Sequence, residues 1–262
     1  TASKTPIRAV DVAADPIALT EIHERAPAAA AATAPEPLSS PGLIAGDELD
    51  RRLAQADPAL GTAAALDAVL DAWGLAPAGA GSLTLDAAVV ELQARGLAVY
   101  SADGADAGSL AGLGPLALVA LRGPGGVDHA VLLDRVGVES VRVVGLLGDP
   151  TPVEVTREGF DTRVSGQARV VWRDFEGLPP VLRWGYRGPA VEWLQTSLRA
   201  LGYLKTPATG EYDGATVAAV RAFQITRGLQ ADGEVGPRTK MALYTALATY
   251  PFPRLVQQGE VG

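Results

Sequence analysis

Cysteine is absent from this chain of 262 residues. Its absence excludes disulfides, thiolate metal sites and any reaction that uses a cysteine nucleophile within this sequence. Aromatic residues make up 5% of the chain, so the cores are expected to be aliphatic. No run of about 18 apolar residues occurs, and the sequence is therefore interpreted as a soluble fragment that begins downstream of any signal or membrane anchor.

Negative charge is concentrated in the first two thirds of the chain. Residues 1–177 carry 13 Lys/Arg against 24 Asp/Glu, a net charge of −11, whereas residues 178–262 carry 9 against 6, a net charge of +3. No Lys/Arg-rich stripe with interleaved aromatic residues appears, so nucleic acid is not an expected partner. Zinc sites usually need several His or Cys ligands, and the chain has two histidines, so no metal or other cofactor is expected.

The order of sequence patterns predicts the fold class of the first region. Residues 1–42 are predicted to be a linker, because the stretch that ends in APAAAAATAPEPLSSPG is rich in Ala and Pro. Residues 43–176 begin with apolar residues at helical spacing and continue with strand-like segments between Gly, Pro and Asp turns. This order predicts an α+β domain with N-terminal helices and an antiparallel sheet. The expected helices cover 61–73 and 82–95, and the expected strands cover 97–102, 116–123, 129–137, 140–148 and 152–156.

An internal repeat distinguishes residues 177–262. The pattern Val-x-x-(Leu/Phe)-Gln occurs at 191–195 and again at 220–224, 29 residues later. Gly-Pro pairs place a proline in the first turn of two helices, and Asp213 is expected to cap the helix between them. These signals predict a small domain of three helices.

The repeat resembles the type 1 peptidoglycan-binding domain almost throughout, over RGPAVEWLQTSLRALGYL and GEYDGATVAAVRAFQITRGLQADGEVGPRT. Gln195 and Gln224 lie next to core positions and are expected to hold loop backbone rather than ligand. The positions expected in the core, at spacings of three and four, are Val191, Leu194, Leu198, Val220 and Phe223.

Peptidoglycan is the ligand that this resemblance implies. Glycan strands offer hydroxyl and N-acetyl groups and stem peptides offer carboxylates, which suit a tyrosine face, hydrogen-bonding side chains and basic groups. Each candidate could instead be a solvated surface residue. The candidates at the polar loop ends are Arg187, Tyr212, Asp213, Arg221, Asp232 and Arg238.

Residues 55–160 resemble the papain-like peptidases that cleave double-glycine leader peptides. Such enzymes need a thiol at a helix N-terminus, a facing histidine, an orienting Asp or Asn, and an upstream glutamine. The resemblance places Gln55 at the glutamine, His129 at the base and Asp149 at the orienting residue, but Gly61 occupies the nucleophile position. The region is therefore predicted to be a pseudo-peptidase with no catalytic residue.

Two residues near the lost nucleophile have alternative interpretations. Thr62 is the neighbouring hydroxyl, but one helical step turns a side chain by about 100° and moves it away from the histidine. His129 is interpreted as a structural histidine at the start of an apolar strand, and the alternative is a residual role in binding peptide in the old cleft.

Together, the two regions resemble the periplasmic part of the general secretion pathway protein A family, over residues 47–250. This resemblance implies a periplasmic, non-enzymatic module of an inner-membrane protein, with an ATPase domain and a membrane helix upstream. It also implies two partners in type II secretion, a B protein and the secretin. The alternatives are a cell-wall hydrolase or leader peptidase that the C-terminal domain targets to the wall, and an adaptor that has lost its wall affinity.

Overall fold

The computed structural model describes residues 42–257 except 80, 82 and 248. The predicted linker lies outside the described residues except for Gly42, and so does Ser82, one of two expected helix starts. Among the described residues, no helix is both long enough and apolar enough to cross a bilayer.

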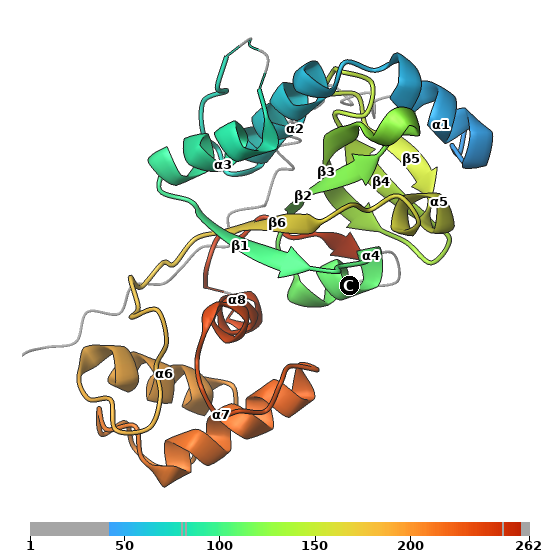
Figure 1. Cartoon of the computed structure of the whole chain (residues 1–262). Coiled ribbons are helices and arrows are strands. Elements are labelled where there is room, and N and C mark those ends of the chain that lie inside the picture. Colours follow the sequence, from blue (N-terminus) through green and yellow to red (C-terminus); the bar gives the residue numbers. More distant parts are fainter. Residues whose placement is uncertain (1–41, 80, 82, 248, 258–262) are drawn as a thin grey trace, which may run out of the picture. The chain divides into compact units, whose positions relative to one another are not determined.

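A sheet of seven strands forms the centre of the first region (Figure 1). Six strands run in the order β1-β6-β2-β3-β4-β5 with antiparallel neighbours, and β7 pairs with β3 in parallel. The α+β class with an antiparallel main sheet is therefore confirmed. The strands are β1 (Ala98–Asp103), β2 (Ala117–Arg122), β3 (Asp128–Val136), β4 (Ser140–Val144), β5 (Val153–Thr156), β6 (Gln167–Trp172) and β7 (Val256–Gln257).

The two faces of this sheet pack against different helices, because successive side chains of a strand point to opposite faces. One face, called the α2 face, carries Leu118 and Leu132 and packs on apolar residues of α2 and α3. The other, called the α1 face, carries Val131 and Leu133 and packs on α1 and α5. The helices of this region are α1 (Gly46–Gln55), α2 (Pro58–Ala72), α3 (Leu85–Ala94), α4 (Ala107–Leu113) and α5 (Arg157–Asp161).

Several element boundaries differ from the sequence prediction. Helix α2 begins three residues earlier than expected, because the Asp57 carboxylate caps it by accepting hydrogen bonds from the Ala59 and Leu60 amides. Strand β4 ends at Val144 rather than 148, since Gly145 has a φ of +96° and turns the chain. Strand β6 and helices α1, α4 and α5 were not predicted, and the last two are short, at 7 and 5 residues.

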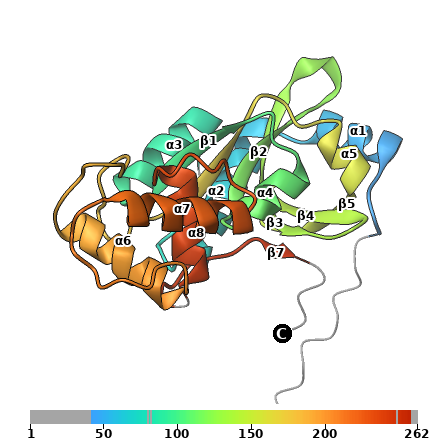
Figure 2. The same ribbon diagram turned by 90° about the horizontal axis from the view of Figure 1, so that it is seen from below.

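The second region contains the three predicted helices (Figure 2): α6 (Pro189–Ala200), α7 (Gly214–Thr226) and α8 (Pro237–Ala246). Asp213 caps α7 as expected, with its carboxylate accepting from the Thr216 amide at 2.9 Å. All the positions predicted for the core are at most 1% exposed, which confirms that prediction: Val191, Leu194, Leu198, Val220 and Phe223.

The chain returns from α8 to the sheet of the first region. The Leu255 amide donates to the Gly114 carbonyl at 2.8 Å, and β7 continues the contact along β3. Lys240 of α8, 3% exposed, donates to the Asp174 carboxylate at 2.9 Å. Residues 252–257 thus pack on the first region, although the sequence assigned them to the second. The boundary predicted at 176–177 stays a prediction.

Candidate functional site

The predicted nucleophile position is filled by backbone. Gly61 lies in the first turn of α2, where an added Cβ would stand 2.6 Å from the Gly145 carbonyl oxygen. The contact is reciprocal, because a Cβ on Gly145 would stand 2.5 Å from the Gly61 carbonyl oxygen. Helix α2 and the turn after β4 therefore approach each other so closely that neither position has room for a side chain.

His129 lies on the other face of the sheet from this contact. The β2–β3 register is regular from residue 128 to residue 133, so His129 shares the α1 face with Val131 and Leu133. Its ring atoms Cδ2 and Nε2 lie 3.1 Å from the place of a Cβ on Gly123, beside Leu53 of α1. Gly61 contacts the α2 face. The expectation that His129 faces the nucleophile position is therefore wrong, because strand alternation turns its ring away.

The environment of His129 supports the structural interpretation. The residue is 5% exposed. Burial lowers the pKa of its imidazole, and the nearby Asp128 carboxylate offsets part of this effect. Asp128 itself is paired with Arg122 at 2.5 Å and accepts from the Ser165 hydroxyl at 2.8 Å. The imidazole is thus packed in a mostly apolar setting that favours its neutral form.

Gln55 and Asp149, the other two positions that the resemblance assigns to the peptidase site, lie at the surface. Gln55 is exposed at the end of α1. Asp149 is exposed as well, and its carboxylate accepts from the Thr151 amide at 2.8 Å within a turn. Thr62 is 4% exposed, and its hydroxyl donates to the Pro58 carbonyl at 2.8 Å. The hydroxyl of Thr62 therefore serves the helix backbone.

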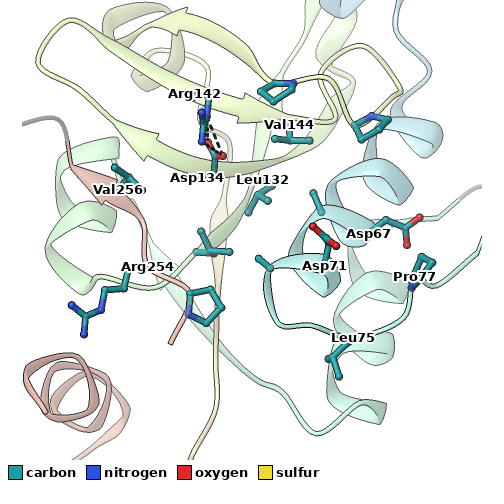
Figure 3. A pocket seen from close by; sticks show the side chains of 16 residues that line it. Asp67, Asp71, Leu75, Pro77, Leu132, Asp134, Arg142, Val144, Arg254 and Val256 are labelled. Atoms are coloured by element: carbon teal, nitrogen blue, oxygen red, sulfur yellow. Dashed lines mark hydrogen bonds and ion pairs between the residues drawn. The ribbon is translucent and has the colours of Figure 1, made fainter. Parts of the chain in front are cut away.

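A groove of about 610 Å³ lies elsewhere in the first region, between α2, the β3–β4 ladder and residues 253–256 (Figure 3). Leu132 and Val144 contribute apolar surface from the sheet, beside the ion pair between Arg142 and Asp134, whose closest nitrogen and oxygen are 2.7 Å apart. Asp67 and Asp71 line it from α2. Neither Gly61 nor His129 is part of its lining, so the groove is distinct from the predicted cleft.

Two buried glutamines organise the loops of the second region, as predicted. The Gln195 amide donates to the Glu211 carbonyl at 2.9 Å and accepts from the Thr209 and Gly210 amides at 2.7 and 2.9 Å. It also donates to the Thr216 hydroxyl at 2.9 Å. These two loop amides and the Glu211 carbonyl therefore find their partners inside the domain.

Gln224 repeats this arrangement one helix later. Its amide donates to the Glu234 carbonyl at 2.9 Å and to the Thr239 hydroxyl at 3.2 Å, and it accepts from the Gly233 amide at 2.9 Å. The internal sequence repeat is thus a repeat of one hydrogen-bonding unit: a helix glutamine, the loop that follows, and a threonine of the next helix.

Tyr212 is not a surface residue. Its side chain is 1% exposed, and its hydroxyl donates to the Gly233 carbonyl at 2.8 Å. Burial raises the pKa of this phenol. The assignment of Tyr212 to a ligand-binding face is therefore corrected: the tyrosine belongs to the core and joins the two loops.

The remaining candidates fall into two groups. Arg187 is exposed directly before α6 and pairs with Glu211 at 2.6 Å. Glu211 lies two residues before Asp213, so this pair is near the start of α7. Asp232 and Arg238 line a hollow of about 190 Å³ near the start of α8. Arg221 lies beside this second group, with its guanidinium donating to the Asp232 carbonyl at 3.4 Å. The role of both groups in binding stays a prediction.

Two aromatic residues that the sequence analysis did not select stand at the surface of the second region. Trp184 is 68% exposed and Tyr186 is 38% exposed. They occur in the segment RWGYR, near the start of the second region and directly before the first Gly-Pro helix entry. Their sequence could have identified them, because two aromatic residues flank a glycine at positions that do not belong to any apolar repeat.

The helices and glutamine-held loops define the class of the second region. Residues 187–243 match the family described as "Putative peptidoglycan binding domain". This match confirms the resemblance predicted from the repeat, and the chain carries a domain of the peptidoglycan-binding type. A "Probable N-acetylmuramoyl-L-alanine amidase" from Bacillus licheniformis is 42% identical over 71 residues, which are 26% of this chain. The chain spans about a fifth (20%) of the length of this curated relative.

Two solved structures are similar to larger parts of the chain. One is a periplasmic domain of the EpsAB fusion protein of the Vibrio vulnificus type II secretion system, at 20% identity and a TM-score of 0.43, covering 71% of this chain and 79% of that one. The other is the N-terminal peptidase C39 like domain of a toxin secretion ATP-binding protein from Vibrio parahaemolyticus, at 18% identity and a TM-score of 0.32. It covers 45% of this chain and 98% of its own.

Proposed function

We propose that this chain is a non-catalytic module that binds peptidoglycan in the periplasm and helps a type II secretion secretin to assemble across the cell wall. The family match over residues 187–243 carries the binding part of this proposal. The secretion part rests on the combination and order of the two regions in the sequence. A B partner of the same pathway, and an upstream membrane helix, belong to the proposal on the same basis.

Wall binding is tested by cosedimentation of the full chain with purified sacculi. We expect retention in the pellet. Alanine variants of the exposed arginines Arg187, Arg221 and Arg238 are expected to weaken retention, since carboxylates of the stem peptides are natural partners for guanidinium groups. A wild-type chain that stays in the supernatant would refute the binding proposal.

The absence of catalysis is proposed because no thiol is available and the nucleophile position is filled. The chain has no cysteine, and Gly61 contacts the backbone of Gly145 instead of presenting a side chain. We expect no muropeptide release from sacculi and no cleavage of a Gly-Gly leader peptide. The amidase relative keeps a wall hydrolase as the second candidate. Turnover that His129→Ala abolishes would favour that candidate.

The groove of the first region gives the module a surface for a protein segment. It combines apolar sheet residues with the carboxylates of Asp67 and Asp71 at the C-terminal half of α2, a helix end that carries no basic residue in its last turn. Carboxylates at this end of the helix favour a cationic occupant. Binding of the B partner to the full chain, weakened by Asp71→Lys, would support this assignment, and unchanged binding would contradict it.

A further inference from the structure

We propose that Trp184 and Tyr186 form a stacking platform for the sugar rings of the glycan strand. This inference rests on the proposed binding of peptidoglycan and deepens it, because it selects the saccharide rather than the stem peptide as the ligand of this surface. It also selects the group near the start of α7, rather than the hollow near α8, as the place of contact.

The platform is built on a turn that holds its tip rigidly at the surface. The Tyr186 amide donates to the Arg183 carbonyl at 3.1 Å, closing a four-residue turn in which Trp184 and Gly185 are central. Gly185 has a φ of +83°, which a side chain would strain. The tryptophan therefore stands at the tip of a turn whose next position strongly favours glycine.

Hydrogen bonds fix this turn to the buried part of the domain. The Gly185 amide donates to the Tyr212 carbonyl at 3.0 Å, and the Tyr212 amide donates to the Tyr186 carbonyl at 2.9 Å. Tyr212 is in turn anchored to Gly233 through its hydroxyl. Because these bonds fix the backbone that carries both aromatic side chains, binding a ligand would require little further ordering of the main chain.

The exposure of Trp184 is unusual for its residue type. Tryptophan is highly buried on average, yet this side chain is 68% exposed and packs at its edge near Gly214, the first residue of α7. Within the described part of the chain, its indole N–H donates no hydrogen bond. A large apolar face with a free donor at its rim is suited to an amphipathic ligand.

A pyranose ring has this amphipathic character. Its C–H face is apolar and stacks on an aromatic ring, while its hydroxyl and N-acetyl groups point sideways to hydrogen-bonding partners. Arg183 and Arg187 flank the two aromatic residues, and the carboxylate of Glu211 lies 2.6 Å from the Arg187 guanidinium. Guanidinium donors and a carboxylate acceptor thus border the platform. A glycan strand, whose polar groups both donate and accept, matches this distribution better than an acidic peptide, whose carboxylates need only cationic partners.

The test measures binding of the full chain to glycan strands that an amidase has freed of stem peptides, with isolated stem peptides and dextran as separate arms. We expect the strands to bind and Trp184→Ala to weaken this binding about tenfold. Trp184→Phe should keep most of the affinity, because it retains a stacking face. Ile225→Ala is the matched control, since Ile225 is also 68% exposed in the same domain but lies at the other end of α7. The affinity of this variant for the strands should stay within about twofold of the wild-type value.

The outcomes separate this inference from the proposed function. Strand binding that is unchanged in Trp184→Ala, with wild-type binding to whole sacculi intact, would overturn the platform and leave the proposed function standing. Binding of stem peptides without strands would do the same, and equal binding of dextran would remove the specificity for peptidoglycan glycans. A wild-type chain that fails to bind sacculi would refute both. Circular dichroism and thermal melts verify that the variants are folded, as the exposure of Trp184 leads us to expect.

Discussion

The two regions of the molecule hold their loops by different means. In the second region, each of two loops closes on a buried amide: Gln195 for residues 209–211 and Gln224 for residues 232–234. In the first region, α2 meets the turn after β4 through Gly61 and Gly145, whose backbones touch. The loops of the second region depend on side-chain amides that donate and accept hydrogen bonds. The contact in the first region depends on the absence of a side chain at both glycines. Substitution should therefore act by lost hydrogen bonds in one region and by steric overlap in the other.

The largest effect is expected in the second region. Gln224→Ala removes every bond made by this side chain and leaves the buried Gly233 amide without its acceptor. We expect a loss of about 3 kcal/mol in the free energy of unfolding, because several buried polar groups lose partners together. Urea denaturation of the full chain measures the loss.

Gln93→Ala is the control for this substitution. Gln93 is exposed in α3 of the first region, and its replacement should change the free energy of unfolding by less than about 0.5 kcal/mol. Gln195→Ala should resemble Gln224→Ala, since the two glutamines form the same unit. Equal stability of all three variants would show that the amides do not hold the loops.

Sequence reasoning succeeded in the second region because its structure follows from local chemistry. The spacing of apolar residues, the Gly-Pro helix entries and the Asp213 cap each act within a few residues, and the repeat shows every feature twice. Tyr212 is the exception. A tyrosine beside a loop suits either a ligand face or the core, and its burial depends on the Gly233 carbonyl, 21 residues away.

In the first region the sequence predicted the α+β class but not the arrangement of the remnant positions. Whether His129 faces Gly61 depends on which face of the sheet the side chain of residue 129 points to and on which face α2 covers. Both are set by long-range packing. Shifting the register by one residue would reverse the result. Similarly, nothing local to Gly61 indicates that residue 145 contacts it.

A second prediction tests the contact between the glycines. Gly61→Ala should lower the free energy of unfolding by about 2 kcal/mol, because its methyl group would overlap the Gly145 carbonyl and force α2 away from the sheet. Thermal or urea unfolding measures this change.

Gly112→Ala in α4 provides a control of opposite sign. An added Cβ there meets nothing within 4 Å, so alanine should stabilise the protein by about 0.5 kcal/mol through its greater helix propensity. If Gly61→Ala behaved like Gly112→Ala, the nucleophile position would be open and the pseudo-peptidase cleft would need to be reconsidered.

The smallest effect is expected at His129, and its sign follows from its pKa. Burial holds the pKa of the folded imidazole below the ordinary value of 6.5, and Asp128 compensates only in part. As pH falls through 6.5, the unfolded chain takes up a proton at this site before the folded chain does, so the free energy of unfolding decreases until the lower folded pKa is passed. His129→Gln should remove this decrease. Melting temperatures of both proteins at about pH 7.5 and about pH 5.5 measure the difference, and this window lies above the titration of the paired aspartates. A larger decrease in the variant than in the wild type would mean that the imidazole is charged in the fold, as a residual catalytic pair with a carboxylate would require.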